Sequence, residues 1–277
     1  MIKPMNFTAV EGGDLSRHIL KAFVAALLCV GLLTSCVTTT TGGFQVNASD
    51  EQAIANYVQL ALAYYEEGDM AGARRHANNA LGIDDRHADA YVVLALISQR
   101  EGDLNLAVDN FERAIRLDRT NSRARNNYAA LLFGMNRFRD AYEQLVIVTN
   151  DAGYDGRAIA FENLGRSALR LDRDRDAETA FTRALQLNSN LYVSALELTL
   201  LKLKREDQVN ARQSFQQYLT IMDFYQLPHT PRALLAGIQI GTYFSDQKLV
   251  DDFSLILSTL YQESPEYKIY RSLTDAN

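Results

Sequence analysis

Cysteine and histidine, the side chains that most often bind transition metals or act as nucleophiles, are scarce in this chain. Its 277 residues contain two cysteines, Cys29 and Cys36, and four histidines. Beyond residue 36 no disulfide and no thiolate metal site can therefore form. The histidines after that point, His76, His87 and His229, also lack the short spacing of a zinc site. We accordingly expect no metal and no cofactor, and we expect apolar burial to stabilise the fold.

Motifs of the common enzyme classes are missing as well. The sequence contains no G-x-S-x-G nucleophile elbow, no phosphate-binding loop and no dinucleotide fingerprint. The pair Asp84-Asp85 is typical of turn chemistry, and Glu162 is a lone helical glutamate for which a structural role is the simpler interpretation. The sequence therefore predicts a protein that is not an enzyme and has no small-molecule substrate.

Proline is nearly absent. The chain has four prolines, and none of them lies between residues 5 and 227. Because proline breaks the interior of a helix, its absence allows a long series of helices to run without interruption. The later prolines fall in the segment QLPHTP, residues 226–231, which reads as an insertion, and at Pro265.

Basic residues are outnumbered and are not clustered. The chain has 28 lysines and arginines against 34 aspartates and glutamates, which gives a net charge of −6. Binding to nucleic acid depends on lysines and arginines gathered on one face. Nucleic acid is therefore not an expected partner.

Apolar runs are too short for a membrane-spanning helix. The run AFVAALLCVGLL, residues 22–33, has 12 residues, whereas a span needs about 20, so an export signal is the better interpretation. The following Leu33-Thr34-Ser35-Cys36 resembles the lipobox of bacterial lipoproteins. That resemblance implies that residues 1–35 are a signal peptide and that Cys36 carries a covalent lipid. The alternative is an ordinary signal peptide with an incidental cysteine, but Cys36 stands at the point where the apolar run stops.

The residues after Cys36 are predicted to be a tether. Residues 36–50 are rich in threonine and glycine and lack an apolar pattern, and a flexible chain of this length spans on the order of 20 Å. Position 37 is Val37 rather than aspartate, which in enterobacteria-like sorting favours the outer membrane. The predicted location is thus the periplasmic face of the outer membrane, with the protein anchored by its lipid.

Self-similarity with a period of 34 residues is the strongest pattern in the chain. Leu60-Ala61 recurs as Leu94-Ala95, and Gly68 recurs as Gly102. Two further registers carry the same residue types, at Tyr128-Ala129 and, after a slip of two residues, at Leu164-Gly165. The period and the small residues resemble the tetratricopeptide repeat (TPR), a pair of antiparallel helices joined by a tight turn.

The repeats predict an all-α fold, a right-handed superhelical solenoid of about six TPR units over residues 51–277. A residue with positive φ is expected in the turns of the first four units, where Gly68, Gly102 and Asn136 suit the position and Asp172 suits it less well. The fifth unit lacks the turn glycine, and in the sixth Phe253 replaces the alanine of the second helix. The units are expected near residues 54–87, 88–121, 122–155, 158–191, 192–225 and 234–267.

The first helices of such a solenoid line its concave face, and their side chains predict a groove that binds a partner. The groove is expected to be mostly apolar, as in surfaces that hold a helix or an extended peptide. Some of its residues could instead pack against the neighbouring unit. The predicted groove residues are Val58, Leu62, Tyr65, Val92, Leu96, Gln99, Asn126, Ala130 and Phe133.

One known use of a TPR groove is excluded by the residues present. TPR co-chaperones hold a C-terminal carboxylate with a clamp of lysine, arginine and asparagine. The corresponding positions here hold Val58 and Leu62, then Val93, then Arg123 and Asn127. Most of the clamp is therefore missing, and a receptor for chaperone tails is not expected.

Several segments resemble one TPR family in particular. The segment Asn126-Asn127-Tyr128, the pair Tyr154 and Arg157, the motif FENLG at residues 161–165 and the motif SPEY at residues 264–267 look like the type IV pilus biogenesis lipoproteins of the PilF/PilW family. The resemblance runs from the lipobox to the end of the chain. It implies a pilotin, an outer-membrane lipoprotein that promotes membrane targeting and multimerisation of the secretin subunit of the type IV pilus. Ala129 departs from the glycine often found there.

A different class of function remains open from the sequence. Lipid-anchored TPR proteins also serve as scaffolds for peptidoglycan hydrolases or for other envelope machinery, and they share this layout. The Asn-Asn-Tyr and Phe-Glu-Asn-Leu-Gly motifs favour the pilotin. Co-purification with secretin and pilus components, or with hydrolases, separates the two alternatives.

Overall fold

The structure, a computed structural model, describes residues 49–274. The predicted signal peptide, the lipidation site Cys36 and all but the last two residues of the predicted tether lie outside the described residues. Residues 49–274 form one compact unit, and no helix within them is both long enough and apolar enough to cross a bilayer.

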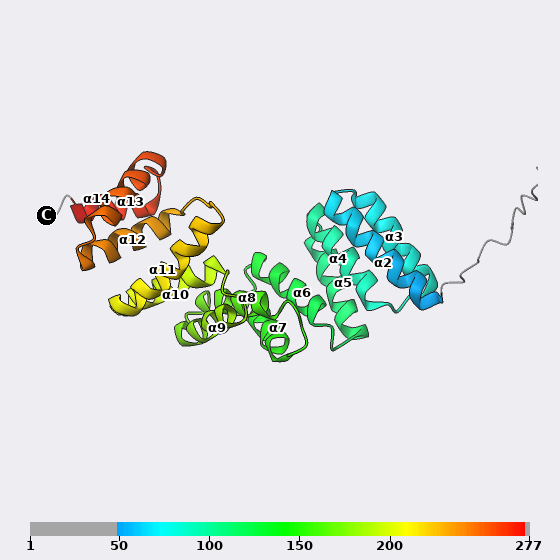
Figure 1. Cartoon of the computed structure of the whole chain (residues 1–277). Coiled ribbons are helices and arrows are strands. Elements are labelled where there is room, and N and C mark those ends of the chain that lie inside the picture. Colours follow the sequence, from blue (N-terminus) through cyan, green and yellow to red (C-terminus); the bar gives the residue numbers. More distant parts are fainter. Residues whose placement is uncertain (1–48, 275–277) are drawn as a thin grey trace, which may run out of the picture. The chain divides into compact units, whose positions relative to one another are not determined.

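Helices account for the whole described unit, residues 49–274, which contains thirteen helices and no strand (Figure 1). Six antiparallel pairs follow one another, and a last helix packs against the sixth pair. The helices are α2 (Asp50–Glu67), α3 (Met70–Ile83), α4 (Ala88–Glu101), α5 (Leu104–Leu117), α6 (Ser122–Gly134), α7 (Phe138–Asn150), α8 (Arg157–Leu169), α9 (Asp174–Leu187), α10 (Tyr192–Lys204), α11 (Gln208–Phe224), α12 (Pro231–Phe244), α13 (Gln247–Leu260) and α14 (Pro265–Thr274).

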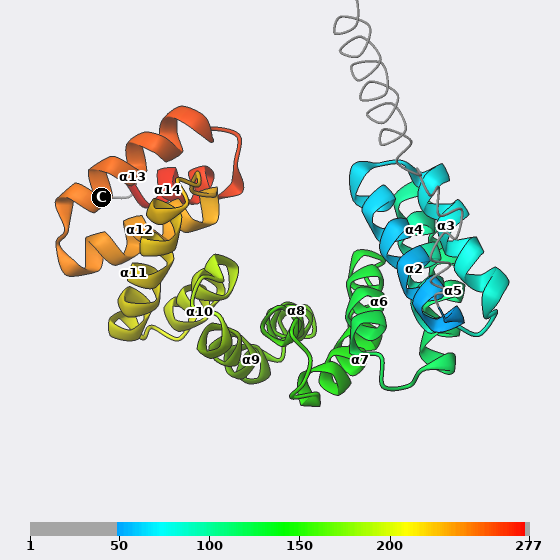
Figure 2. The ribbon, with the colours of Figure 1, turned by 45° about the vertical axis from the view of Figure 1, so that its right-hand side comes forward.

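Contacts between pairs are uneven on the two sides of the stack. The first helix of each pair contacts the first helix of the next, from α2 and α4 through α10 and α12. Consecutive second helices of residues 49–274 make no comparable contact. Figure 2 shows the pairs following one another in chain order. Because the spacing is tighter on the first-helix side, that side is the concave one, and the predicted all-α TPR solenoid is confirmed.

Each pair turns through one residue with positive φ, and the sequence predicts this residue in the first four pairs. Gly68 and Gly102 have φ of 87° and 86°, which costs little without a Cβ. Asn136 and Asp172 take the same conformation, at 60° and 58°, so the less suitable aspartate is tolerated. In the last two pairs the position is filled by Glu206 and Ser245, with φ of 59° and 57°.

Small residues let the two helices of a pair approach closely. The alanines of the repeat pattern are fully buried, including Ala61, Ala95 and Ala129 on first helices. Gly165 replaces alanine in the fourth pair because the Phe181 ring occupies the space. A Cβ added to Gly165 would lie 2.7 Å from that ring, closer than packed carbons allow. The glycine of the FENLG motif is thus explained by packing.

The segment QLPHTP joins the fifth pair to the sixth through His229. The Tyr218 hydroxyl of α11 lies 3.2 Å from Nδ1 of His229, and the hydroxyl of Tyr261, the residue that follows α13, donates a 3.0 Å hydrogen bond to the His229 carbonyl oxygen. The imidazole also packs 5.0 Å from the ring of Phe253. Burial among these groups lowers the pKa of His229. The insertion is therefore part of the joint between the two pairs.

This joint predicts a loss of stability on acidification. An unfolded histidine has a pKa of about 6.5, and the folded His229 has a lower one. As the pH falls below about 6.5, the unfolded state takes up the proton first, so the free energy of unfolding decreases until the pH passes the folded pKa. Between about pH 7 and pH 5, urea unfolding should show a steeper loss of stability for the wild type than for His229→Gln. Parallel profiles would contradict the assignment, since all other titrating groups cancel in the comparison.

Candidate binding groove

The predicted groove residues recur at three registers on the concave side. Val58, Val92 and Asn126 share the first register, Leu62, Leu96 and Ala130 the second, and Tyr65, Gln99 and Phe133 the third. All nine lie on α2, α4 or α6, the first helices of pairs one to three. The structure therefore places them on equivalent faces of successive first helices.

Two of the nine do not reach the surface. Val58 and Val92 are 7% and 3% exposed and belong to the apolar cores of their pairs. Their register faces the next first helix, and the contacts of α2 with α4 and of α4 with α6 cover it. For these two positions the prediction of a groove surface is wrong. The accessible remainder of the groove, whose residues are partly or fully exposed, is Leu62, Tyr65, Leu96, Gln99, Asn126, Ala130 and Phe133.

Tyr65 is held by an arginine of the second pair. The guanidinium carbon of Arg100 lies 4.9 Å from the centre of the Tyr65 ring. Arg100 Nη1 also donates a 2.6 Å hydrogen bond to the Tyr65 carbonyl oxygen. This contact joins the end of α2 to the end of α4 and fixes one edge of the groove.

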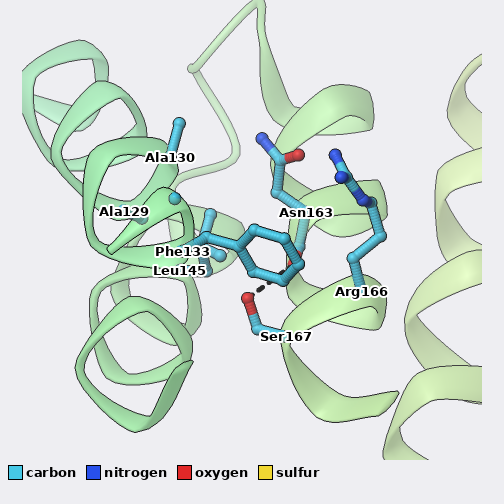
Figure 3. A pocket seen from close by; sticks show the side chains of 8 residues that line it. Ala129, Ala130, Phe133, Leu145, Asn163, Arg166 and Ser167 are labelled. Atoms are coloured by element: carbon cyan, nitrogen blue, oxygen red, sulfur yellow. Dashed lines mark hydrogen bonds between the residues drawn. The ribbon is translucent and has the colours of Figure 1, made fainter. Parts of the chain in front are cut away.

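A pocket of about 160 Å³ lies between the third and fourth pairs. Ala130 and Phe133 form its α6 side, and Asn163, Arg166 and Ser167 form its α8 side. Figure 3 shows the Phe133 ring reaching from α6 toward α8, with Asn163 and Arg166 on the far side. The Ser167 hydroxyl is already used, since it donates to the Asn163 carbonyl oxygen at 2.9 Å. The pocket therefore offers an apolar wall and two polar side chains, an amide and a guanidinium.

The α8 residues of this pocket were not among the predicted groove residues. Arg166 follows Ala130 by 36 residues, so it continues the register of Leu62, Leu96 and Ala130 into the fourth pair. The prediction stopped at the third pair although the repeat pattern continued beyond it. Extending the register by one unit would have found Arg166.

The FENLG motif acts on both sides of the fourth pair. Oε2 of Glu162 accepts hydrogen bonds from the backbone N–H of Ser194 at 3.1 Å and from its hydroxyl at 2.8 Å. Ser194 lies in the first turn of α10, so the carboxylate satisfies an otherwise unpaired N–H and complements the helix dipole. Asn163 Nδ2 lies 3.5 Å from Asn126 Oδ1. Glu162 thus has the structural role that its isolation in the sequence suggests.

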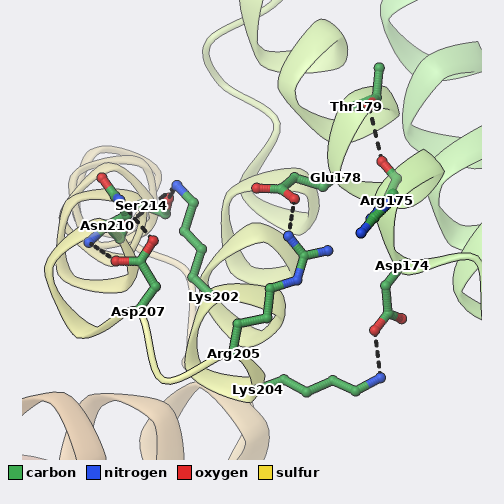
Figure 4. Close-up of polar contacts among 10 residues, drawn as sticks. All are labelled: Asp174, Arg175, Glu178, Thr179, Lys202, Lys204, Arg205, Asp207, Asn210 and Ser214. Carbon is green, nitrogen blue, oxygen red and sulfur yellow. Dashed lines mark hydrogen bonds and ion pairs between the residues drawn. The ribbon is translucent and has the colours of Figure 1, made fainter.

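The charge run at residues 170–176 and the nearby Glu178 contact the fifth pair. Asp174 forms an ion pair with Lys204 at 2.6 Å, and Glu178 forms one with Arg205 (Figure 4). Both cations lie at or just after the end of α10, whereas both carboxylates lie on α9. Exposed pairs of this kind contribute little individually, so their main effect is to set the register of the fourth pair against the fifth.

The two tyrosines with the most strongly raised pKa values do not lie in one site. Burial, assisted by a hydrogen bond to Glu112, raises the pKa of Tyr128 to about 12, and burial raises the pKa of Tyr218 to about 12. The two tyrosines belong to different core clusters.

Among residues 49–274, no three side chains of histidine, cysteine, aspartate or glutamate gather in a geometry that could hold a metal ion.

Comparison with known proteins agrees with the repeat pattern. The family model described as tetratricopeptide repeat matches residues 88–121, which span α4 and α5. The chain is 32% identical over 253 residues to the type IV pilus assembly protein PilF of Pseudomonas aeruginosa, and the match covers 91% of this chain and 98% of that protein.

Solved structures also indicate a relationship to type IV pilus proteins. The structure is similar to that of P. aeruginosa PilF with a TM-score of 0.75 and 32% identity, covering 80% of this chain and 98% of the other. It is similar in fold to PilW, a widely conserved type IV pilus biogenesis factor, with a TM-score of 0.64 and 22% identity over 79% of this chain and 98% of that one. The concave face of first helices and the positive-φ turn residues fit this relationship. On the near full-length match to PilF, the chain belongs to the PilF/PilW family of TPR proteins, which act in type IV pilus biogenesis.

Proposed function

We propose that the protein is a pilotin, an outer-membrane lipoprotein that brings the secretin subunit of the type IV pilus to the membrane and promotes its assembly into a ring. The lipid on Cys36 is the anchor, and residues 36–50 form the tether. The groove on α2, α4, α6 and α8 holds a segment of the secretin. The protein acts as a scaffold for another protein and not as an enzyme.

The observation that carries this proposal is the partly apolar groove on the concave side of a PilF-like solenoid. Leu62, Tyr65, Leu96 and Phe133 keep part of their surface there while contributing to the cores beneath. An accessible apolar strip of this kind is typical of a surface that binds a helix or peptide. The relationship to PilF supports a pilus protein as the partner over the peptidoglycan hydrolases considered from the sequence.

Two attachments explain how such a protein can act. Lipid chains hold the protein at the bilayer, and the groove holds the secretin. Joining both interactions in one molecule through a short tether raises the effective concentration of the secretin at the membrane. The expected result is secretin that assembles where the lipid is anchored.

Replacing the anchor tests this function. In cells carrying Cys36→Ser, we expect secretin rings to be misplaced from the outer membrane or to remain unassembled, because the groove no longer has a fixed location. The measurement is the amount of secretin multimer in separated inner and outer membranes. Cys29→Ser is the matched control, since Cys29 lies within the predicted signal peptide and should be removed with it.

Two results would reject the proposal. One is a Cys36→Ser strain with normal secretin rings and normal pili. The other is a mass spectrum of the purified wild-type protein in which Cys36 carries no lipid.

A further inference from the structure

One row of apolar side chains along the groove is interrupted by a charged residue. Leu62, Leu96, Ala130, Arg166 and Leu200 occupy one register on the first five first helices, at spacings of 34, 34, 36 and 34 residues. Four of the five are apolar. Arg166 is the one charged member, and its neighbour Ala130 is the smallest. The pocket between the third and fourth pairs lies beside these two residues.

The guanidinium of Arg166 is positioned but not neutralised. It stacks over the Phe133 ring, with its central carbon 4.9 Å from the ring centre. Of the ion pairs formed within residues 49–274, none involves Arg166. Stacking on a ring covers the face of a guanidinium and leaves its in-plane N–H groups free, in the fork geometry that binds a carboxylate through two hydrogen bonds.

Asn163 adds a second polar group on the same wall. Its side-chain amide makes one long contact, 3.5 Å to Asn126 Oδ1, so it retains hydrogen-bonding capacity toward the pocket. Ala130 opens the apolar wall at this point, because a leucine of the kind found in pairs one and two would extend into the space. The pocket therefore combines room for an apolar side chain with a cation and an amide at its rim.

We propose that this pocket binds an aliphatic side chain of the partner together with a neighbouring aspartate or glutamate, whose carboxylate pairs with Arg166. The inference rests on the pilotin function and names the chemistry of the bound segment. The apolar row continues past Arg166 on both sides, to Leu96 and to Leu200. A bound chain therefore extends in both directions, which identifies the carboxylate as an internal side chain and not a C-terminus.

Affinity measurements with the secretin subunit of the same host test the assignment. Immobilised protein and solubilised secretin should bind about tenfold more weakly with Arg166→Gln, because a charge-assisted hydrogen bond is lost. Arg166→Lys should fall between the wild type and Arg166→Gln, since lysine keeps the charge without the planar fork. Arg170→Gln is the matched control: Arg170 is also exposed, directly follows the same helix and stacks over a ring, that of Phe138 at 4.2 Å.

A second variant tests the pocket without changing a charge. Ala130→Leu installs the residue that pairs one and two carry at this register, and Ala130 is exposed, so the fold should tolerate it. We expect it to weaken secretin binding about tenfold by filling the pocket. Raising the salt concentration should weaken the wild type more than Arg166→Gln, which has lost its ion pair.

The outcomes separate this inference from the function on which it rests. If the wild type captures no secretin, the pilotin function fails and the pocket assignment with it. If the wild type binds and both Arg166→Gln and Ala130→Leu bind equally well, the pocket assignment alone is overturned. A secretin with a C-terminal extension should bind normally, and loss of its binding would overturn the assignment to an internal acidic residue.

Discussion

Replacing Phe215 by alanine is expected to lower the free energy of unfolding by about 3–5 kcal/mol. The Phe215 side chain on α11 is 1% exposed. Its ring stacks on Tyr218 at 5.6 Å and meets the edge of Phe253 on α13 at 6.0 Å. Alanine would leave a cavity at the joint between the fifth and sixth pairs, and the surrounding rings could collapse into it only in part. Urea unfolding followed by circular dichroism measures the change.

The same helix offers a matched control. Phe224 is 77% exposed, so Phe224→Ala makes the same chemical change without a cavity and should alter stability by less than about 0.5 kcal/mol. Because each unit of a solenoid contacts only its neighbours, the loss in Phe215→Ala should also appear first in amide exchange of α10 to α14. A uniform loss of protection over α2 to α14, or equal effects of the two variants, would contradict this account of the packing.

Much of this fold can be predicted from the sequence because TPR pairs depend on local rules. The turn residues Gly68, Gly102, Asn136 and Asp172 all adopt positive φ. The residue type at this single position is enough to indicate the turn. The small residues at Ala61 and its equivalents are buried, since close helix approach admits little else. A period of 34 residues repeats these local rules and so specifies the stack.

The groove is less predictable because exposure depends on neighbouring pairs. Val58 and Leu62 lie four residues apart on one helix face, and both are apolar. Contact between α2 and α4 covers Val58 to 7% exposure and leaves Leu62 partly accessible. A difference of about 40° around the helix decides which of the two side chains is exposed. The hydrophobicity of the two residues does not distinguish them. The orientation of the Arg166 guanidinium likewise depends on stacking over Phe133, which lies on another pair.

A second large effect is expected at the groove itself. In the double variant Leu62→Glu plus Leu96→Glu, capture of the secretin should fall at least about 100-fold. Each leucine is already partly buried and contributes about 1 kcal/mol when a partner covers its remaining apolar surface, and a buried glutamate adds the larger cost of an uncompensated charge. Two such losses on successive first helices correspond to two or more orders of magnitude in affinity. Pull-down of the secretin subunit measures the effect.

The control must add the same charges elsewhere, since both leucines also touch the cores of their pairs. Leu60 and Leu104 are 44% and 39% exposed; Leu60 lies roughly 200° around α2 from Leu62, and Leu104 begins the second helix α5. Leu60→Glu plus Leu104→Glu should therefore leave capture unchanged. Circular dichroism and the unfolding midpoint establish that both double variants fold. If the folded groove variant still captures secretin as the wild type does, the secretin is bound elsewhere, because no apolar segment could lie across two glutamates at adjacent positions of its path.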